Sequence, residues 1–221
     1  MRRFFRLAAW LMLMWLAALL LYGAKGYVDA VRAGPALAAR ADRLIAAGRG
    51  AAGLGPDRIE MLLEVDDPGF RRHGGIDMST PGAGRTTITQ SLAKRLGFER
   101  FSPGLRKIRQ SGYALGLEQV LSKPQILALF LDTAEMGPGR NGRWVKGFYT
   151  ASLDHYGRPP AALERRQFLS LLAVLVAPRE FSLDRPDPAL DERVARIERL
   201  IARQCRPRDH NDVRLEGCAR R

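Results

Sequence analysis

The order of apolar and polar positions separates one long apolar run near the N-terminus from shorter segments with helical spacing. Residues 7–22 carry no charge, and a helix that spans a bilayer needs about 20 apolar residues. Phe4 and Phe5 extend the run, and the long side chain of Arg6 can reach the membrane interface. The pattern predicts a cytoplasmic tip and one transmembrane anchor helix over residues 1–25.

The charges beside this run predict its orientation. Arg2, Arg3 and Arg6 precede it, and the cytoplasmic flanks of membrane helices are enriched in Lys and Arg. We therefore expect a single-pass protein of the inner (cytoplasmic) membrane, with its soluble domain on the outer, periplasmic side. A cleaved signal peptide is the alternative. We favour an uncleaved anchor, because Tyr22 stands where a small residue would precede cleavage after Ala24.

Helical spacing continues through most of the remaining chain. Residues 26–57 are interpreted as a membrane-proximal connector, with a helix over 26–49 that breaks at Gly34–Pro35 and a loop over 48–57. A short apolar piece follows at residues 59–63. Further helices are predicted over residues 87–96, 105–121, 126–136, 145–156, 162–178 and 190–201. The pattern predicts a mainly α fold.

Composition narrows the possible partners. The chain has 221 residues, a length typical of one domain, and a net charge of +13. Such a charge favours anionic partners. Since the domain is expected outside the cytoplasm, we expect no nucleic acid and favour the membrane surface and phosphate-bearing lipids. The two cysteines, Cys205 and Cys218, lie in a polar, basic tail over residues 205–221 and are too few for a zinc site. They either form a disulfide or remain thiols.

A polar, glycine-rich stretch at residues 64–94 differs from its helical neighbours. It combines adjacent aspartates, an aromatic residue, a histidine and a glycine-rich loop that opens onto a helix. Thr86 or Thr87 is the expected N-cap of that helix. Glycines before a helix N-terminus favour an anion, whereas a solvated surface helix is the plainer interpretation. A second polar face follows on the next helix, formed by Arg106, Lys107 and Gln110.

Five segments in this order resemble glycosyltransferase family 51, the peptidoglycan glycosyltransferases. The segments are DDPGFRRHGGID, TTITQSLAK, LRKIRQSGYALGLE, SKPQILALFLDTAEMGPG and ASLDHYGRP. The likeness is to members that carry an N-terminal anchor and no penicillin-binding domain. It implies a single lysozyme-like helical domain over residues 58–204 behind the transmembrane helix.

The resemblance also implies a reaction. Members of the family polymerise lipid II, a disaccharide peptide carried on undecaprenyl pyrophosphate. A carboxylate acts as general base on the acceptor sugar hydroxyl, and lipid pyrophosphate leaves with inversion. Basic side chains stabilise the leaving group, and a divalent cation, Mg²⁺ or Mn²⁺, can assist them. The implied partners are lipid II, nascent glycan strands, the membrane and other cell-wall synthesis proteins.

Residues that keep the family's motifs are the candidates for substrate binding. They are Asp67, Phe70 and His73 in the first motif, Thr87, Gln90 and Lys94 in the second, and Arg106 and Lys107 in the third. The resemblance assigns no metal ligand. Lys94 is similar to the family's phosphate-facing lysine.

The two candidate catalytic positions depart from the family pattern. The family's catalytic glutamate falls on Asp66, which is one methylene shorter, and a misplacement of about 1 Å can cost roughly a hundredfold in rate. Its second functional glutamate falls on Gln110, which cannot transfer a proton. Glu64 is an alternative base whose spacing is off by two residues.

Other departures lie nearby. Arg85 and Thr86 replace Gly and Ser, Asp132 replaces Asn, and the stretch from Asp77 to Gly84 is shorter than usual. Three hypotheses remain. The first is a working, divergent glycosyltransferase that uses Asp66. The second is a catalytically impaired homologue that binds lipid II or glycan strands, or acts as a scaffold. The third is a basic anchored protein that binds acidic lipid.

Overall fold

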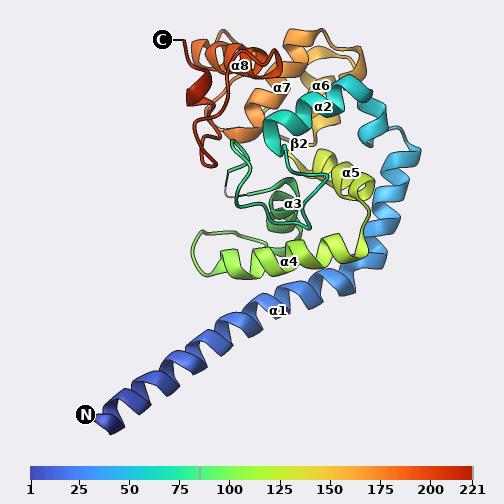
Figure 1. Cartoon of the computed structure of the whole chain (residues 1–221). Coiled ribbons are helices and arrows are strands. Elements are labelled where there is room, and N and C mark those ends of the chain that lie inside the picture. Colours follow the sequence, from blue (N-terminus) through green and yellow to red (C-terminus); the bar gives the residue numbers. More distant parts are fainter. Residues whose placement is uncertain (85, 221) are drawn as a thin grey trace.

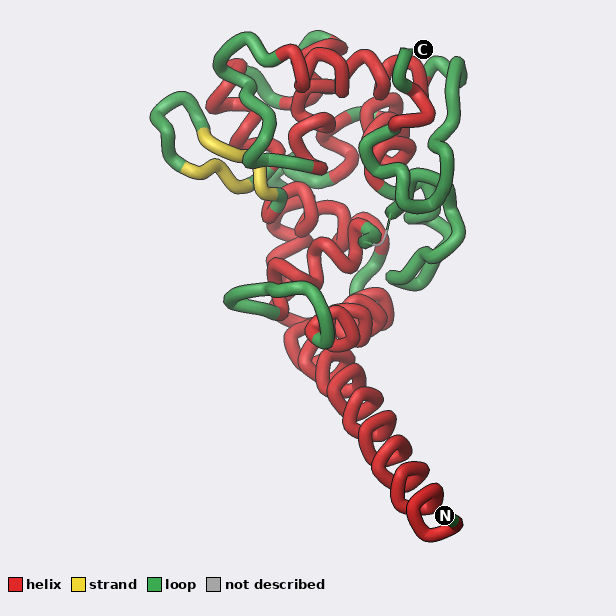
Figure 2. Tube along the Cα trace, turned by 90° about the vertical axis from the view of Figure 1, so that its left-hand side faces the viewer, coloured by secondary structure: helices red, strands yellow, loops and turns green. Residues whose placement is uncertain are grey.

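The computed structural model describes residues 1–84 and 86–220, with the backbone alone for Arg2. Helices dominate these residues, which confirms the predicted mainly α fold (Figures 1 and 2). The α-helices are α1 (Arg2–Ala46), α2 (Pro56–Asp66), α3 (Ile88–Gly97), α4 (Arg106–Val120), α5 (Lys123–Thr133), α6 (Phe148–Tyr156), α7 (Arg165–Val176) and α8 (Pro188–Ile201). Short 3-10 segments cover Ala51–Leu54, Pro160–Ala162 and Glu216–Cys218.

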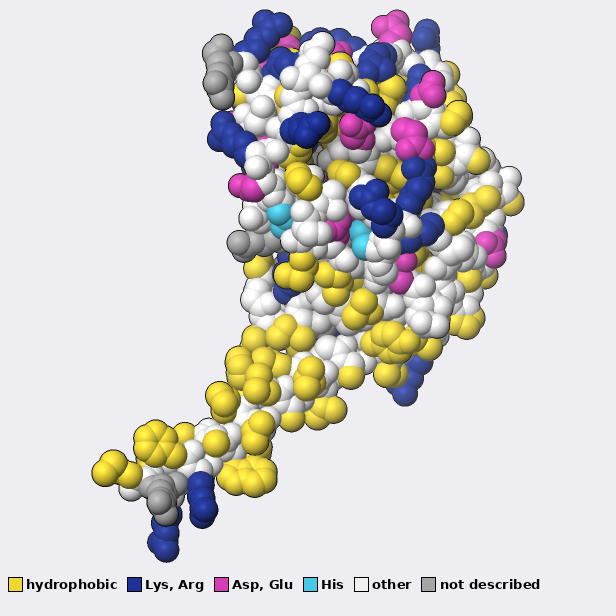
Figure 3. All heavy atoms as spheres, viewed as in Figure 1, with side chains coloured by type: hydrophobic (Ala, Val, Ile, Leu, Met, Phe, Trp, Pro, Cys, Tyr) yellow, Lys and Arg dark blue, Asp and Glu magenta, His cyan; other side chains and the backbone are white. Residues whose placement is uncertain are grey.

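Helix α1 projects from the body with its apolar half uncovered. Large apolar side chains between Phe4 and Leu21 are exposed, and the helix is long and apolar enough to cross a membrane. Figure 3 shows this apolar surface, with basic side chains at the free end. The predicted break at Gly34–Pro35 is wrong, because Pro35 lies inside the continuous helix. Proline inside a helix can kink it without ending it, and Figure 1 shows that α1 changes direction.

Glycines let α1 and α4 pack closely. A Cβ atom on Gly112 would overlap the carbonyl oxygen of Gly23, and one on Gly26 would overlap the carbonyl of Arg109. Small residues permit such close backbone approach between helices. The Arg109 guanidinium also donates to Asp29 at 2.8 Å. Helix α4 therefore lies against the continuation of the anchor (Figure 1).

The core forms around α5 and α7. Residues Ile126 to Leu131 of α5 are all buried, and Phe130, Phe148 and Phe168 are among the largest buried side chains. A helix that is apolar all round belongs inside a protein. Figure 1 shows α5 between α1 and α6, with α7 and α8 at the far end of the body from the anchor.

A β-hairpin follows α5 where the sequence pattern predicts helix. Strand β1 (Glu135–Pro138) pairs antiparallel with β2 (Trp144–Lys146). The helix predicted to residue 136 ends at Thr133, and those predicted from 145 and 162 begin at Phe148 and Arg165. Gly137 and Gly142 adopt φ angles of 83° and 73°, values that glycine alone reaches readily.

The C-terminal tail is ordered by a disulfide. Cys205 and Cys218 are bonded to each other, which settles the alternative left open by the sequence. The bond closes a loop that folds back on α8. Arg199 of α8 donates to the carbonyl of Cys218 at 2.6 Å.

Candidate active site

Asp66 is the last residue of α2 and lies on the wall of a cavity of about 1070 Å³. Pro56 at the start of α2 and Gly55 before it define where this helix begins. The residues predicted as a short apolar piece, 59–63, form its middle. Helices α3 and α5, the hairpin and residues 175–180 supply the other walls of the cavity.

The carboxyl group of Asp66 is set up to hold a proton near neutral pH. Burial raises its pKa to about 6, and the adjacent charge of Asp67 acts in the same direction, while Arg95 and Arg193 oppose the shift. A general base works best when its pKa lies near the operating pH. Asp66 therefore changes its charge in the pH range in which a general base is most effective.

Arg95 on α3 lies on the same cavity wall and is a residue that the sequence analysis missed. Its Nη1 donates to Ser91 Oγ at 2.8 Å and its Nε to Thr133 Oγ1 at 3.1 Å. The guanidinium sits 4.8 Å from the ring centre of Phe130. Its Nη2 is buried and has no hydrogen-bond partner among the described residues. Burial lowers the pKa of Arg95 to about 10, so it remains a cation.

Lys94 shares the cavity wall with Asp66 and Arg95. Its Nζ lies 5.9 Å from the ring centre of Phe101. Burial and the neighbouring charge of Arg95 lower the pKa of Lys94, and Glu135 opposes them. Among the described residues that line it, the cavity thus brings the raised-pKa carboxyl group of Asp66 together with the neighbouring cations Lys94 and Arg95.

Asp67 and His73 hold the loop after α2 against the start of α3. Asp67 is fully buried and accepts from His73 Nε2 at 2.9 Å and from the backbone N–H of Ile88 at 2.9 Å. The N–H of Gly75 donates to His73 Nδ1 at 3.0 Å. Since Nδ1 accepts a hydrogen bond, the neutral imidazole carries its proton on Nε2, and this N–H donates a hydrogen bond to the Asp67 carboxylate.

Thr87 caps α3 and confirms one of the two expected N-caps. Its hydroxyl oxygen accepts from the N–H of Gln90 at 3.0 Å, and the Gln90 side chain accepts from the Thr87 N–H at 3.2 Å. The Thr87 hydroxyl donates to the carbonyl of Gly75 at 2.7 Å. Thr87 and Gln90 are buried, so these motif residues shape the loop behind the cavity.

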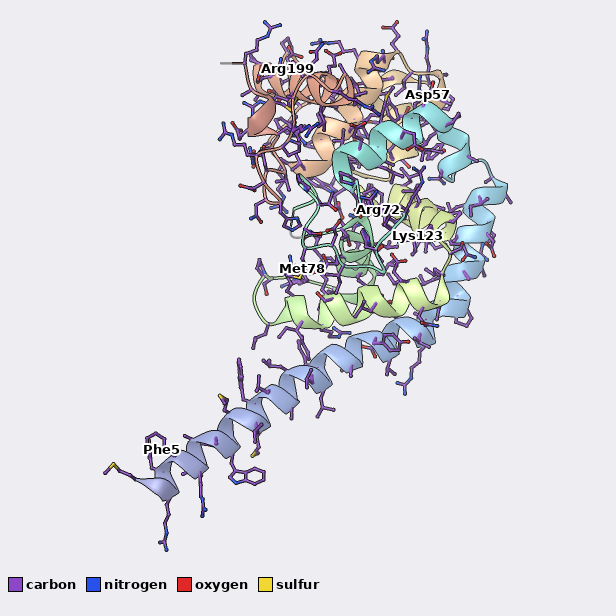
Figure 4. The ribbon with its side chains drawn as sticks, in the orientation of Figure 1. Phe5, Asp57, Arg72, Met78, Lys123 and Arg199 are labelled. Atoms are coloured by element: carbon purple, nitrogen blue, oxygen red, sulfur yellow. A yellow bond between two sulfur atoms is a disulfide. The ribbon has the colours of Figure 1, made fainter. Side chains whose placement is uncertain are left out.

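Phe70 and Lys123 complete this packing. Phe70 is buried, and Lys123 Nζ lies 4.5 Å from its ring centre. Lys123 also donates to the carbonyl of His73 at 2.7 Å. Figure 4 shows Lys123, at the start of α5, reaching the loop that carries Arg72.

Gln110 does not join Asp66 in the cavity. It is 1% exposed, and its Nε2 donates to the carbonyl of Gln90 at 2.7 Å. Its Oε1 is buried without a partner among the described residues. Gln110 is also absent from the described residues that line the cavity. The side chain ties α4 to α3.

Arg106 and Lys107 are the first two residues of α4. Arg106 donates to the carbonyl of Arg100 at 2.6 Å and lines a separate cavity of about 500 Å³ together with Tyr22 of α1. Lys107 donates to Thr86 at 3.2 Å. Of the predicted site residues, the described structure therefore brings Asp66 and Lys94 to one cavity and Arg106 to another.

The other departures from the family pattern have distinct surroundings. Glu64 precedes Asp66 by two positions on a helix, which turns its side chain about 200° away. Asp132 accepts from Arg40 at 2.6 Å and from Arg49 at 3.2 Å, so its charge is paired. Arg85 lies outside the described residues.

Asp67, His73 and Asp77 place ligand atoms within 4.8 Å of one another. Their hydrogen bonds do not fit a resident cation. The Nε2 proton of His73 is engaged by Asp67, and Asp77 Oδ1 accepts from the N–H groups of Ser79 at 2.9 Å and Thr80 at 3.0 Å. A metal would have to displace the imidazole proton.

Comparison with known proteins identifies related sequences. The family model described as Transglycosylase matches residues 51–203. Proteins named biosynthetic peptidoglycan transglycosylase are similar to this chain in Rhodospirillum centenum (29% identical, 67% of this chain, 68% of the relative) and Pseudomonas aeruginosa (30% identical, 66% of each). The Escherichia coli relative of that name is 30% identical over 63% of this chain, which covers 61% of the relative's own length.

Proposed function

The chain belongs to the transglycosylase family, and on that premise we propose that it polymerises lipid II into peptidoglycan glycan strands, with Asp66 as general base. The observation that carries the proposal is a carboxyl group with a pKa of about 6 on the wall of a large cavity. Lys94 and Arg95 stand on the same wall. This combination suits a reaction that removes a proton from a sugar and expels an anion.

The reaction begins at the acceptor sugar. The Asp66 carboxylate takes the proton of the attacking hydroxyl, whose oxygen then forms a bond to the anomeric carbon of the donor. The bond from that carbon to the lipid pyrophosphate oxygen breaks, and the electron pair leaves with the pyrophosphate. Attack opposite the leaving group inverts the anomeric centre. Asp66 ends the step protonated and returns its proton to water.

Lys94 and Arg95 stabilise the charge that develops on the leaving pyrophosphate. Donors that are already oriented before the reaction cost little reorganisation and act strongly in a partly desolvated cavity. The Arg95 guanidinium is held in place by Ser91, Thr133 and Phe130.

The proposed place of action is the outer face of the inner membrane. Helix α1 is long and apolar enough to anchor the chain, and the arginines at its start favour a cytoplasmic N-terminus. The Cys205–Cys218 disulfide supports an oxidising, extracytoplasmic environment for the domain. Nascent glycan strands and other cell-wall synthesis proteins are the proposed partners.

Incubation of the purified full chain in detergent with lipid II tests the proposal. We expect glycan strands that a muramidase digests to disaccharide units. A failure to form strands at any pH between about 5 and about 8, the range in which a base with this pKa changes charge, would contradict the proposal.

A second candidate is a homologue that binds lipid II without polymerising it. The burial of Gln110 away from the cavity favours it, because the second carboxylate of the family has no counterpart at this position. Sugar-dependent binding of lipid II without product would support this candidate. Binding that ignores the sugar and falls steeply with salt would instead indicate attraction to acidic lipid alone.

A further inference from the structure

The C-terminal tail, of which the structure describes residues 205–220, lies beyond the segment matched by the family and is ordered. The carboxylate of Asp212 accepts from the backbone N–H groups of Arg208 at 2.9 Å, Glu216 at 2.6 Å and Gly217 at 2.9 Å. The Cys205–Cys218 disulfide closes the same loop. These hydrogen bonds and the disulfide hold the tail in one conformation.

This tail packs against the loop that precedes α3. The N–H of Gly82 donates to the carbonyl of Asp209 at 2.9 Å, and the N–H of Gly84 donates to the carbonyl of His210 at 2.7 Å. His210 Nδ1 in turn donates to the carbonyl of Thr80 at 3.0 Å. Figure 1 shows the tail descending from α8 to this loop.

The loop has the glycines that such contact requires. Gly82 and Gly84 adopt φ angles of 79° and 67°. A Cβ atom on Gly82 would lie 2.7 Å from Pro207, and one on Gly84 would overlap Val213. The contact falls on the segment from Asp77 to Gly84, and the tail covers that side of the domain.

A cavity of about 420 Å³ lies where the tail, the loop and α8 meet. Its walls include Asn211 and Val213 from the tail, Gly82–Gly84 from the loop and Arg193 from α8. Asp66 and Ser91 line this cavity and also the larger one. The two cavities therefore share a border at Asp66, and a substrate bound there has space on both sides.

Arg193 gives this second cavity a polar donor. Arg193 is 5% exposed, and its Nε and Nη1 are buried without hydrogen-bond partners among the described residues. Buried N–H groups of native proteins are almost always hydrogen-bonded, to protein, water or ligand. A bound water or an oxygen-bearing ligand is therefore needed to satisfy these donors.

We propose that the C-terminal tail is part of the substrate-binding site, with Asn211 and Val213 forming one wall of a subsite beside Asp66. The subsite takes an oxygen-rich part of the same lipid-linked saccharide, and Val213 contacts it through its methyl groups. The inference rests on the proposed function, since Asp66 is the point where both cavities meet. It adds a specificity-determining element from outside the matched segment.

A thiol introduced at position 213 tests the proposal by substrate protection. Val213 is 36% exposed, and the two native cysteines are joined in the disulfide, so Val213→Cys provides a selective target for a maleimide. A bound ligand covers the walls of its pocket, so saturating lipid II with a shortened lipid should slow labelling about threefold or more. Leu153→Cys, on the exposed face of α6, is the matched control and should label at one rate throughout.

A second variant gives an independent readout. Val213→Trp fills the cavity from the tail side, and we expect KM for lipid II to rise about tenfold or more with kcat unchanged. Loss of folded protein would instead lower the apparent kcat, so the two effects are distinguished. Leu153→Trp should leave KM unchanged. Unprotected labelling together with a wild-type KM in Val213→Trp would overturn the proposal. If the wild-type protein did not polymerise lipid II at all, the result would instead contradict the proposed function.

Discussion

Asp66 and Arg95 face one cavity from two different helices, and each shifts the pKa of the other toward its charged form. Burial acts against both charges. The pair therefore keeps a carboxylate and a guanidinium in a site where neither would be favoured alone. Such a site favours proton transfer and departure of an anion, but burying its charges destabilises the folded protein. This destabilisation can be measured.

Neutralising Asp66 should stabilise the protein at neutral pH. The folded pKa of about 6 lies roughly two units above the ordinary value of 3.8, which corresponds to at most about 3 kcal/mol of destabilisation. The sign follows from linkage. The folded state binds the proton more tightly, so stability falls as pH rises from 3.8 to about 6 and stays low above it.

We expect Asp66→Asn to melt at a higher temperature than wild type at pH 7.5, with the difference disappearing near pH 4. Thermal unfolding of the full chain in detergent at both pH values provides the measurement. Asp57→Asn, at an exposed position in the first turn of the same helix, is the control and should show no such gain. An Asp66→Asn protein that is less stable than wild type at pH 7.5 would contradict the claim that the charged Asp66 carboxylate destabilises the folded protein.

Removing the Arg95 cation should move the activity profile to higher pH. Burial and Asp67 would then raise the pKa of Asp66 with less opposition, so the base would lose its proton later. Loss of an oriented donor from a leaving-group site also costs about 10²-fold or more in kcat. Arg95→Gln should show both effects, and Arg95→Lys should keep the pH midpoint near that of wild type. Profiles of kcat against pH provide the test. If Arg95→Gln and Arg95→Lys had the same pH midpoint, the role of the Arg95 charge in setting the pKa of Asp66 would be rejected.

A glutamate at position 110, where the resemblance places the second functional glutamate of the family, should not create a second catalytic group. The Nε2 of Gln110 donates to the carbonyl of Gln90, and a carboxylate there would place two acceptors in contact. A buried acceptor left unpaired costs about 1–3 kcal/mol, and more when it is charged. Gln110→Glu is therefore expected to lower the melting temperature at pH 7.5 and to recover at acidic pH, where a protonated acid can donate. A rise in polymerisation rate with unchanged stability would be the opposite result.

Opening the tail disulfide should loosen the C-terminal tail. The bond joins cysteines separated by 13 positions, and a loop of about this length contributes about 3 kcal/mol in the chain-entropy account. The double substitution Cys205→Ser with Cys218→Ser should lower the melting temperature by several degrees. Dithiothreitol should lower it by the same amount in wild type and have no effect on the double variant. Equal melting temperatures with and without reductant in the wild-type protein would contradict a stabilising bond.

The sequence predicts most helices because their apolar stripes and caps are local. Thr87 with Gln90 three residues later is such a cap, and the apolar run of α5 marks a buried helix. The hairpin after α5 was not predicted, because the apolar run of α5 favoured a helix that continues to residue 136. Asn141–Gly142 is nevertheless a hairpin turn signal. The break expected at Pro35 fails because α1 retains its helix on both sides of the proline.

The site is less accessible to sequence reasoning because it depends on packing. Arg95 in the last turn of α3 resembles an ordinary complement to the helix dipole, and only the approach of α2 places it near Asp66. The resemblance places Gln110 at a catalytic position of the family, but the close contact of α3 and α4 buries it. The tail carries no motif, and its contact with Gly82 and Gly84 joins segments more than a hundred residues apart.

The pH dependence of lipid II polymerisation in wild type, Asp66→Asn and Glu64→Gln tests the central claim most directly. We predict a wild-type rate that rises through pH of about 6 to a plateau. Asp66→Asn should lose about 10²–10⁴-fold in rate. Glu64→Gln, changed on another side of the same helix, should keep the wild-type profile. Polymerisation by Asp66→Asn at the wild-type rate would contradict the assignment of Asp66 as the base.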